Sequence, residues 1–349
     1  MRFGPGGSTR LTQSPNRLCS PAAEFAAARP AASLADLAGG LADQQRRLDV
    51  LDAGGDPRTE VRAVFSWSYR HLDASAARTF RLAGLHPGPD FDSYAVAALT
   101  GGTAERGRQL LGVLARAHLI QPTTEPGRYG MHDLLRAYAC ELVAARDSDA
   151  ERRAALTRLF DHYLHTAAAA MDTLIPAERH RRPHVPAAAT PVPPVASTAG
   201  ARGWLDAHRA TLVAVAGQTA AEGWPSHATR LATILFRHLK VSGRYPEGRA
   251  IHSYALHAAQ SSGDRGAQAD AWRSLGVLDA WQGRYEEAAG QLRQALAAFR
   301  ETGDLAGEAR TLGYLGIVDW WQGDYQQAAG QIQQALVIFA ATGSGRWAR

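Results

Sequence analysis

The last third of the chain contains two helical patterns of apolar residues that alternate with each other. In the first pattern, apolar side chains recur three or four positions apart, at Ala271, Leu275, Leu278 and Trp281. The second pattern has similar spacing, at Tyr285, Ala288, Leu292, Ala295, Leu296 and Phe299. Residues spaced in this way share one face of an α-helix. Gly283 and Gly303 follow the two stretches, and glycine commonly ends a helix. The pattern therefore predicts a helix, a tight turn and an antiparallel helix.

This pair of helices is predicted three times, in units over residues 228–263, 267–303 and 307–343. The turns within the units lie forty residues apart and read Gly243-Arg244-Tyr245, Gly283-Arg284-Tyr285 and Gly323-Asp324-Tyr325. Small residues such as Gly276, Ala288 and Ala295 are predicted where two helices approach closely. A fixed period of this length is typical of stacked units, none of which buries its apolar face alone.

The units resemble the tetratricopeptide repeat in its longer form of about forty residues. The resemblance covers residues 228–343 and rests on Leu275-Gly276, Gly283-Arg284-Tyr285 and Ala295-Leu296. It implies a superhelix over residues 203–349, entered through a helix at Gly203–Ala216, whose concave groove binds a protein or peptide. Because solenoids need a polar cap, we expect either a longer array or a cap formed by Trp347 and its neighbours.

Residues 57–146 have the pattern of a smaller, mostly helical domain. The predicted elements are helices around Phe65 and Phe80, a cap at Asp73, helices at Ser93–Leu99 and Ala104–Ala117, and a hairpin framed by Leu119–Pro122 and Arg128–Met131. Helix, turn, helix, hairpin and helix is the order of a winged-helix domain. The fold class predicted for the whole chain is therefore mainly α, a winged helix with a small hairpin followed by an α-solenoid.

Three segments of this domain resemble the winged-helix end of the NB-ARC module of STAND-type signalling nucleoside triphosphatases. They are Phe65-Ser66-Trp67-Ser68-Tyr69, Leu85-His86-Pro87-Gly88-Pro89 and Arg128-Tyr129-Gly130-Met131-His132-Asp133-Leu134-Leu135-Arg136. The order of parts matches the actinobacterial AfsR-like transcriptional regulators, in which such a module precedes tetratricopeptide repeats. The resemblance implies that His132 contacts a phosphate of bound ADP. The alternative is that His132 stabilises the start of a helix.

The rest of a nucleotide pocket is missing from the sequence. The chain has a single lysine, Lys240, and no glycine-rich turn precedes it, so the phosphate-binding P-loop is absent. Hydrolysis of ATP or GTP by this polypeptide alone is excluded, and we expect no cofactor, with ADP bound only if another polypeptide supplies the nucleotide core. Residues 31–56 resemble the tail of the helical domain of NB-ARC. Residues 1–30, rich in Pro, Gly and Ser, are predicted to be disordered.

The winged helix also raises the hypothesis of DNA binding. Arg106 and Arg108 lie on the predicted recognition helix and would have to project into the major groove. The alternative is a solvated helix face, because no basic hairpin accompanies these arginines.

Tryptophans recur on the first helix of the units, at 272, 281, 320 and 321, and most of them are predicted to lie in the core between units. Neighbours on a helix diverge by about 100°, so Trp320 and Trp321 cannot both point inward. One of the pair is predicted to be exposed and to contact a partner. The candidate residues of the partner groove are Trp320, Trp321, Tyr285 and Tyr325.

Two connecting segments separate the domains. Residues 147–178 are predicted to form a helical connector, with its helix over Asp149–Pro176. Residues 179–202 form a Pro-rich basic linker, which is predicted to be a solvated hinge.

Composition limits the function classes. Of 349 residues, 46% are hydrophobic, and the net charge of +5 is too mild to imply nucleic acid. The two cysteines, and the pairs His162/His165 and His252/His257, lack metal-ligand spacing. No membrane span, signal peptide or catalytic constellation is found. We therefore expect a cytoplasmic, non-enzymatic regulatory scaffold that binds a protein, with a DNA-binding regulator and an ADP-binding switch as alternatives.

Overall fold

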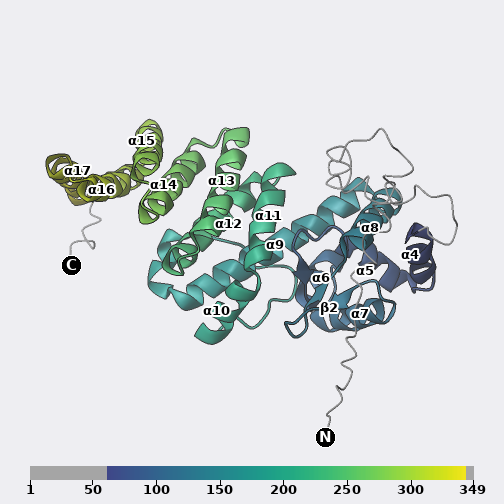
Figure 1. Ribbon diagram of the computed structural model, residues 1–349. Helices are drawn as coiled ribbons and strands as arrows, with labels where there is room; N and C mark the ends of the chain where they lie inside the picture. Colours follow the sequence, from purple (N-terminus) through teal and green to yellow (C-terminus); the bar gives the residue numbers. More distant parts are fainter. Residues whose placement is uncertain (1–60, 343–349) are drawn as a thin grey trace, which may run out of the picture.

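The computed structural model describes residues 61–342, and it is built almost entirely of helices arranged in a row (Figure 1). The expectations for residues 1–30 and 31–56 and for Trp347 lie outside the described residues. The first domain comprises α4 (Val61–Arg70), α5 (Ala74–Ala83), β1 (Asp90–Phe91), α6 (Ser93–Thr100), α7 (Ala104–Arg116), β2 (Gln121–Pro122), β3 (Tyr129–Gly130) and α8 (Asp133–Arg146). None of the helices within 61–342 is long and apolar enough to cross a membrane.

The helix starts of the first domain are capped by polar side chains. Asp73, Asp92 and Thr103 each accept a hydrogen bond from a backbone N–H in the first turn of α5, α6 and α7, which satisfies donors that have no partner inside the helix. The strands form one antiparallel sheet in the order β1-β3-β2. The helices and the hairpin lie where the sequence predicted them. Strand β1 was not predicted, because two residues are too short to show the alternation of a strand.

A 26-residue helix, α9 (Asp149–Leu174), joins the first domain to the rest of the molecule. It begins with a capping box, in which Ser148 and Glu151 each bind the other's backbone N–H. Arg158 in its third turn donates to the carbonyl oxygens of Ala98 at 2.9 Å and Leu99 at 2.7 Å, at the C-terminal end of α6. An arginine in this position satisfies free carbonyl groups and the negative end of the helix dipole.

The segment predicted to be a solvated hinge is packed against the protein, so that prediction was wrong. After a 3₁₀ helix, η1 (Pro176–Arg181), the chain places Val185 and Val192 against the core and buries Val195. Arg182 donates to Asp172 of α9 at 2.8 Å with only 8% of its side chain exposed. The valines between the prolines provide the apolar surface that a solvated linker would lack.

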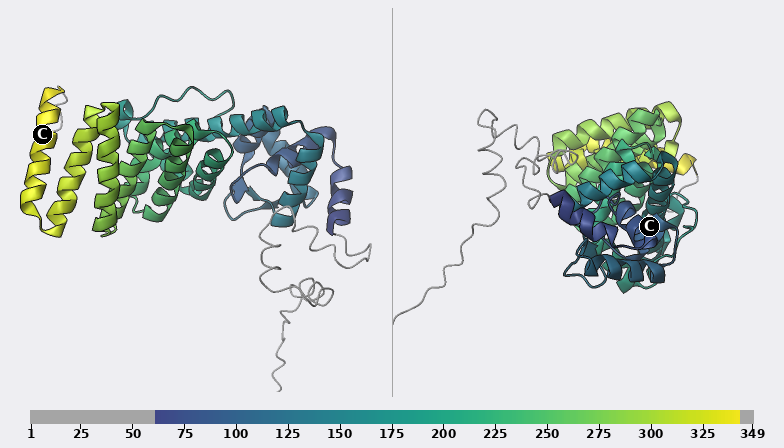
Figure 2. Two further views of the ribbon diagram at one scale, coloured as in Figure 1. Left: turned by 90° about the horizontal axis from the view of Figure 1, so that it is seen from above. Right: turned by 90° about the vertical axis from the view of Figure 1, so that its right-hand side faces the viewer.

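The predicted lead-in helix is two helices, α10 (Thr198–Ala207) and α11 (Arg209–Ala221), which meet at His208. Six further helices follow, namely α12 (Pro225–Val241), α13 (Tyr245–Ser262), α14 (Arg265–Trp281), α15 (Tyr285–Thr302), α16 (Leu305–Gln322) and α17 (Tyr325–Ala341). They form antiparallel pairs that stack side by side, each pair against the next (Figure 2). The pairs correspond to the predicted units.

A glycine in the left-handed region ends each of the helices from α11 to α16. These glycines are twenty residues apart, at 223, 243, 263, 283, 303 and 323, with φ between 67° and 93°. Gly263 and Gly303 are each followed by an aspartate that caps the next helix, so one dipeptide stops a helix and starts another. Gly223 ends α11 in the same way, so the spacing of twenty residues begins one helix before the first predicted unit.

The arginine of the Gly-Arg-Tyr motif has a partner in the helix before it. Arg284 donates to the fully buried Asp279 at 2.5 Å, and Arg249 from the preceding unit donates to the same carboxylate at 2.5 Å. The buried carboxylate therefore ties a turn to the neighbouring unit as well as to its own helix.

One continuous core joins the first domain to the first unit. A single cluster of buried apolar residues runs from Tyr69 to Ala255 and includes side chains of α5, α9, α10 and α12. Smaller clusters, centred on Leu292 and Phe299, lie between the later units. The first domain and the start of the solenoid are therefore packed as one body.

His86, His162 and His252 are almost completely buried, and the pKa of each is lowered. Burial lowers the pKa of His86 to about 3, with the nearby Arg136 adding to the effect, and burial likewise lowers the pKa of His162 to about 4. Burial and the charge of Arg273 lower the pKa of His252 to about 3. His162 and His252 are therefore neutral side chains packed in the core. Within residues 61–342 no group of His, Cys, Asp and Glu side chains is arranged to hold a metal.

We expect Gly276→Ala to destabilise the protein by about 1–3 kcal/mol, because a Cβ there would lie 2.7 Å from Cγ of Leu292 and 3.0 Å from the carbonyl oxygen of Ala288. Gly290→Ala is the matched control. No atom lies within 4 Å of a Cβ placed at Gly290, so replacing this glycine inside α15 should raise the free energy of unfolding by about 0.5–1 kcal/mol. Urea unfolding of both variants measures the difference. Equal effects would contradict the close approach of α14 and α15.

We expect the protein to lose stability as the pH falls from 6.5 towards 4. His86, His162 and His252 stay neutral in the fold, whereas in the unfolded chain they take up protons below about pH 6.5, so acid favours unfolding. Each contributes about 1.4 kcal/mol per pH unit in this range. His252→Gln should therefore make the pH dependence of the urea midpoint shallower. His257→Gln, at an exposed position on the same helix, should leave it as in the wild type.

Candidate functional site

The first helices of the three units, α12, α14 and α16, form one face of the solenoid, here called the first-helix face. Two of the cavities within residues 61–342 lie between these helices. The larger, of about 430 Å³, lies at the N-terminal halves of α12 and α14 and is lined by polar groups that include Arg182, Arg230 and Asp270. The smaller, of about 240 Å³, lies towards the C-terminal ends of α12, α14 and α16 and is here called the Lys240 pocket. Its lining residues are Lys240, Val277, Ala280, Trp281, Leu292, Tyr314, Ile317, Val318 and Trp321.

Aromatic side chains make up much of the wall of the Lys240 pocket. The rings of Trp281 and Trp321 meet edge to face with centroids 5.9 Å apart, and Tyr285 lies 5.8 Å from Trp321. Trp281 is 53% exposed, so its prediction as a core residue was wrong. It lies about 60° around the helix from the buried Leu278, at the edge of the apolar stripe, where it faces the pocket instead of the next helix.

The ammonium group of Lys240 is held among aromatic rings. Its Nζ atom lies 5.5 Å from the ring centroid of Trp281 and 5.9 Å from those of Phe236 and Tyr314, within the range of cation–π attraction. Burial, and then the charge of Arg237, lower the pKa of Lys240. Lys240 has no hydrogen bond or ion pair with any residue between 61 and 342.

The structure brings some of the predicted groove residues together and separates others. Trp321 lines the pocket and Tyr285 packs against it. Trp320 is 57% exposed outside the pocket, as expected for one member of the pair, at the position that Lys240 and Ala280 occupy in the earlier units. Tyr325 is exposed one unit further along. Sequence reasoning missed the contributions of Lys240, Trp281 and Tyr314.

The candidate residues of the first domain lie on its surface. His132 is exposed and caps α8, where its Nδ1 accepts a hydrogen bond from the N–H of Leu134 at 3.3 Å. Arg108 forms an exposed ion pair with Glu105 on the same helix, and Arg106 donates to Gln109 at 3.3 Å. These three residues lie on two elements, α7 and the start of α8, and no contact joins them.

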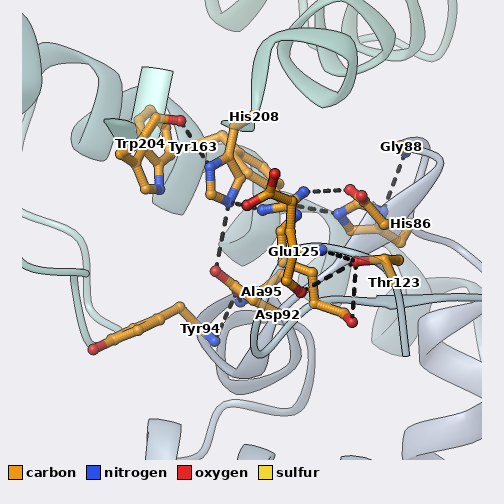
Figure 3. Close-up of polar contacts among 12 residues, drawn as sticks. His86, Gly88, Asp92, Tyr94, Ala95, Thr123, Glu125, Tyr163, Trp204 and His208 are labelled. Carbon is orange, nitrogen blue, oxygen red and sulfur yellow. Dashed lines mark hydrogen bonds and ion pairs between the residues drawn. The ribbon is translucent and has the colours of Figure 1, made fainter. Parts of the chain in front are cut away.

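A buried polar cluster that the sequence did not reveal connects the first domain to α10 and α11 (Figure 3). Arg128, beside β3, donates to Nε2 of His208 at 2.5 Å and forms an ion pair with Asp90 of β1. Nδ1 of His208 lies 2.9 Å from the carbonyl oxygen of Trp204, to which it donates. A guanidinium group can only donate, so Nε2 of His208 accepts from Arg128.

The cluster continues towards α9. Nε2 of His86 lies 2.7 Å from the hydroxyl of Tyr163, and the N–H of Gly88 donates to Nδ1 of His86 at 3.1 Å. Asp92 lies 3.5 Å from His208. Burial opposes ionisation of Asp92, but the neighbouring His208 side chain and the hydrogen bond from the N–H of Ala95 outweigh this effect, so the pKa of Asp92 is lowered. We call the group of Asp90, Asp92, Arg128 and His208 the polar junction.

Comparison with known proteins matches parts of the chain. The family model for the tetratricopeptide repeat matches residues 267–341. Regulatory protein AfsR of Streptomyces griseus is 39% identical over 214 residues, which cover 60% of this chain and 21% of the relative. Regulatory protein AfsR of Streptomyces coelicolor (strain ATCC BAA-471 / A3(2) / M145) is 44% identical over 151 residues, covering 42% of this chain and 15% of the relative.

The chain thus spans about a fifth or less of the length of these curated relatives. Among solved structures, a signal transduction ATPase with numerous domains (STAND) and a tetratricopeptide repeat sensor, from Pyrococcus horikoshii, covers 93% of this chain and 54% of its own. Its TM-score of 0.30 at 13% identity is too low to establish a common fold. The chain is AfsR-like in sequence over more than half of its length, and it carries tetratricopeptide repeats towards its C-terminal end.

Proposed function

We propose that this chain is the partner-binding part of a regulatory protein, and that the first-helix face binds a segment of another protein. The observation that carries the proposal is the aromatic wall of the Lys240 pocket. Trp281 and Ile317 are 53% and 39% exposed on one face, although such side chains are normally buried. The tetratricopeptide repeat match and the similarity to AfsR regulatory proteins support a regulatory role with interaction repeats.

Binding at the repeats would reach the first domain through rigid contacts. We interpret residues 57–146 as a winged helix that carries the Met131-His132-Asp133 motif of AfsR-like proteins. The shared core and the polar junction hold this domain in a fixed position relative to α12. A change in the packing of α12 on α14 would therefore act on the surface where β3 leads into α8. In this proposal any nucleotide core, and the ADP that His132 would contact, belongs to sequence outside this chain.

The two alternative functions have less support. DNA binding through α7 would use Arg108, whose guanidinium is already paired with Glu105 on an otherwise unremarkable helix face. Nucleotide binding would use His132, whose side chain caps α8. The contacts of Arg108 and His132 therefore favour neither DNA binding nor nucleotide binding over partner binding.

We expect the double variant Trp281→Ala, Trp321→Ala to lose at least tenfold in affinity for peptides selected from a displayed random library on the full chain. Removing two aromatic anchors at the centre of an interface commonly costs more than about 2 kcal/mol. Trp67→Ala is the matched control, because Trp67 is 66% exposed on α4, outside the solenoid. Fluorescence anisotropy of labelled peptides measures both. Equal affinity of the groove variant and the wild type would contradict the proposal.

We expect Arg128→Met to destabilise the protein by about 3–5 kcal/mol, since it leaves Asp90 without its buried cationic partner and His208 without a donor to Nε2. Arg108→Met, which removes an exposed pair with side chains 62% and 64% exposed, should change stability by less than about 1 kcal/mol. Urea unfolding followed by circular dichroism compares them. In Arg128→Met the first domain should also unfold at lower urea than the repeats. A midpoint like that of the control would show that the polar junction does not couple the two parts.

A further inference from the structure

We infer that the Lys240 pocket, on the partner-binding face proposed above, receives a bulky apolar side chain of the partner together with an adjacent carboxylate. The ligand class is a protein segment in which an aromatic or large aliphatic residue stands next to an acidic residue. The inference deepens the proposed function, because it names the chemistry of the partner.

The size and lining of the pocket specify the apolar side chain. A cavity of about 150 Å³ is large enough to bind benzene, so a pocket of about 240 Å³ accommodates one large side chain. Apart from the ammonium of Lys240, the pocket is walled by aliphatic and aromatic groups. Ile317, which lines the pocket, is 39% exposed and continues this apolar surface to the solvent.

The unpaired ammonium group of Lys240 specifies the carboxylate. An ammonium group has three donors, and ring faces offer it attraction but no acceptor oxygen. The carboxylate that acts on the charge of Lys240 is that of Glu178, and this carboxylate already pairs with Arg237 at 3.7 Å. Lys240 and Arg237 are therefore two cations, three positions apart on α12, and Glu178 is the one acidic side chain among residues 61–342 recorded near both of them. A ligand carboxylate would balance this charge and meet the free donors.

The equivalent positions in the other units give the site a direction. Lys240 corresponds to Ala280 on α14 and to Trp320 on α16. Only the first of these three positions is charged, so a bound segment has its acidic group at α12 and its apolar residues towards α16. A basic side chain at the α12 end would repel the ammonium of Lys240, and an amide would offer it an acceptor oxygen without a balancing charge.

Two small probes that differ only in charge test this inference. The full chain is titrated with 3-phenylpropionate and with 3-phenylpropionamide at constant ionic strength, and binding is followed by tryptophan emission, since Trp281 and Trp321 line the pocket. We expect the acid to bind at least tenfold more tightly than the amide, as for a hydrogen bond to a charged group.

Three variants assign the preference to named residues. Lys240→Gln should bring the two probes within about twofold of each other while leaving amide binding unchanged. Lys240→Arg should keep the preference for the acid, and Trp281→Ala should weaken both probes. Circular dichroism of each variant confirms that the helices are intact. Equal binding of acid and amide to the wild type, or a preference that survives in Lys240→Gln, would overturn the inference.

The peptide selection separates this inference from the proposed function. If neither probe binds while selected peptides bind and depend on Trp281 and Trp321, the pocket chemistry is wrong and the partner-binding face stands. If no peptide depends on that face, the proposed function itself fails.

Discussion

The packing of helix α9 on both of its sides is the constraint on which the arrangement of the chain depends. Its 26 residues, about 39 Å of helix, contact α6 of the first domain and α10 and α12 of the solenoid. Arg158 anchors it to α6 through two carbonyl oxygens, and Trp224 at the start of α12 packs its ring on Phe160 at 5.1 Å. The first domain and the start of the solenoid both pack on the apolar surface of α9. A large movement of either one would therefore expose buried residues of the shared core.

The parts of the fold that rest on local chemistry could be predicted from the sequence. Glycine at Gly263 and aspartate at Asp264 fix a helix end and a helix start by themselves, and the period of forty residues repeats this signal. The hairpin at 119–131 was predicted for the same reason. The linker at 179–202 was misjudged because proline content indicates the lack of a helix. It does not report whether the valines between the prolines find an apolar surface.

The candidate site was predicted only in part, because its residues meet through stacking. Trp320 and Trp321 are adjacent on a single helix, so helix geometry alone predicts that they point in different directions and that one of them is exposed. That Lys240 faces Tyr314 depends on the angle between α12 and α16, which no local pattern specifies. The contact between Arg128 and His208, eighty residues apart, depends in turn on where α9 places α10.

The composition of the chain has a consequence at the Lys240 pocket. Because Lys240 is the only lysine in the sequence, every enzyme or reagent that acetylates, methylates or crosslinks lysine side chains has one target in this polypeptide. That target stands on the first-helix face, and its lowered pKa increases the fraction of reactive free amine at neutral pH. Neutralising or enlarging this one amine would alter the groove and leave every other side chain as it was.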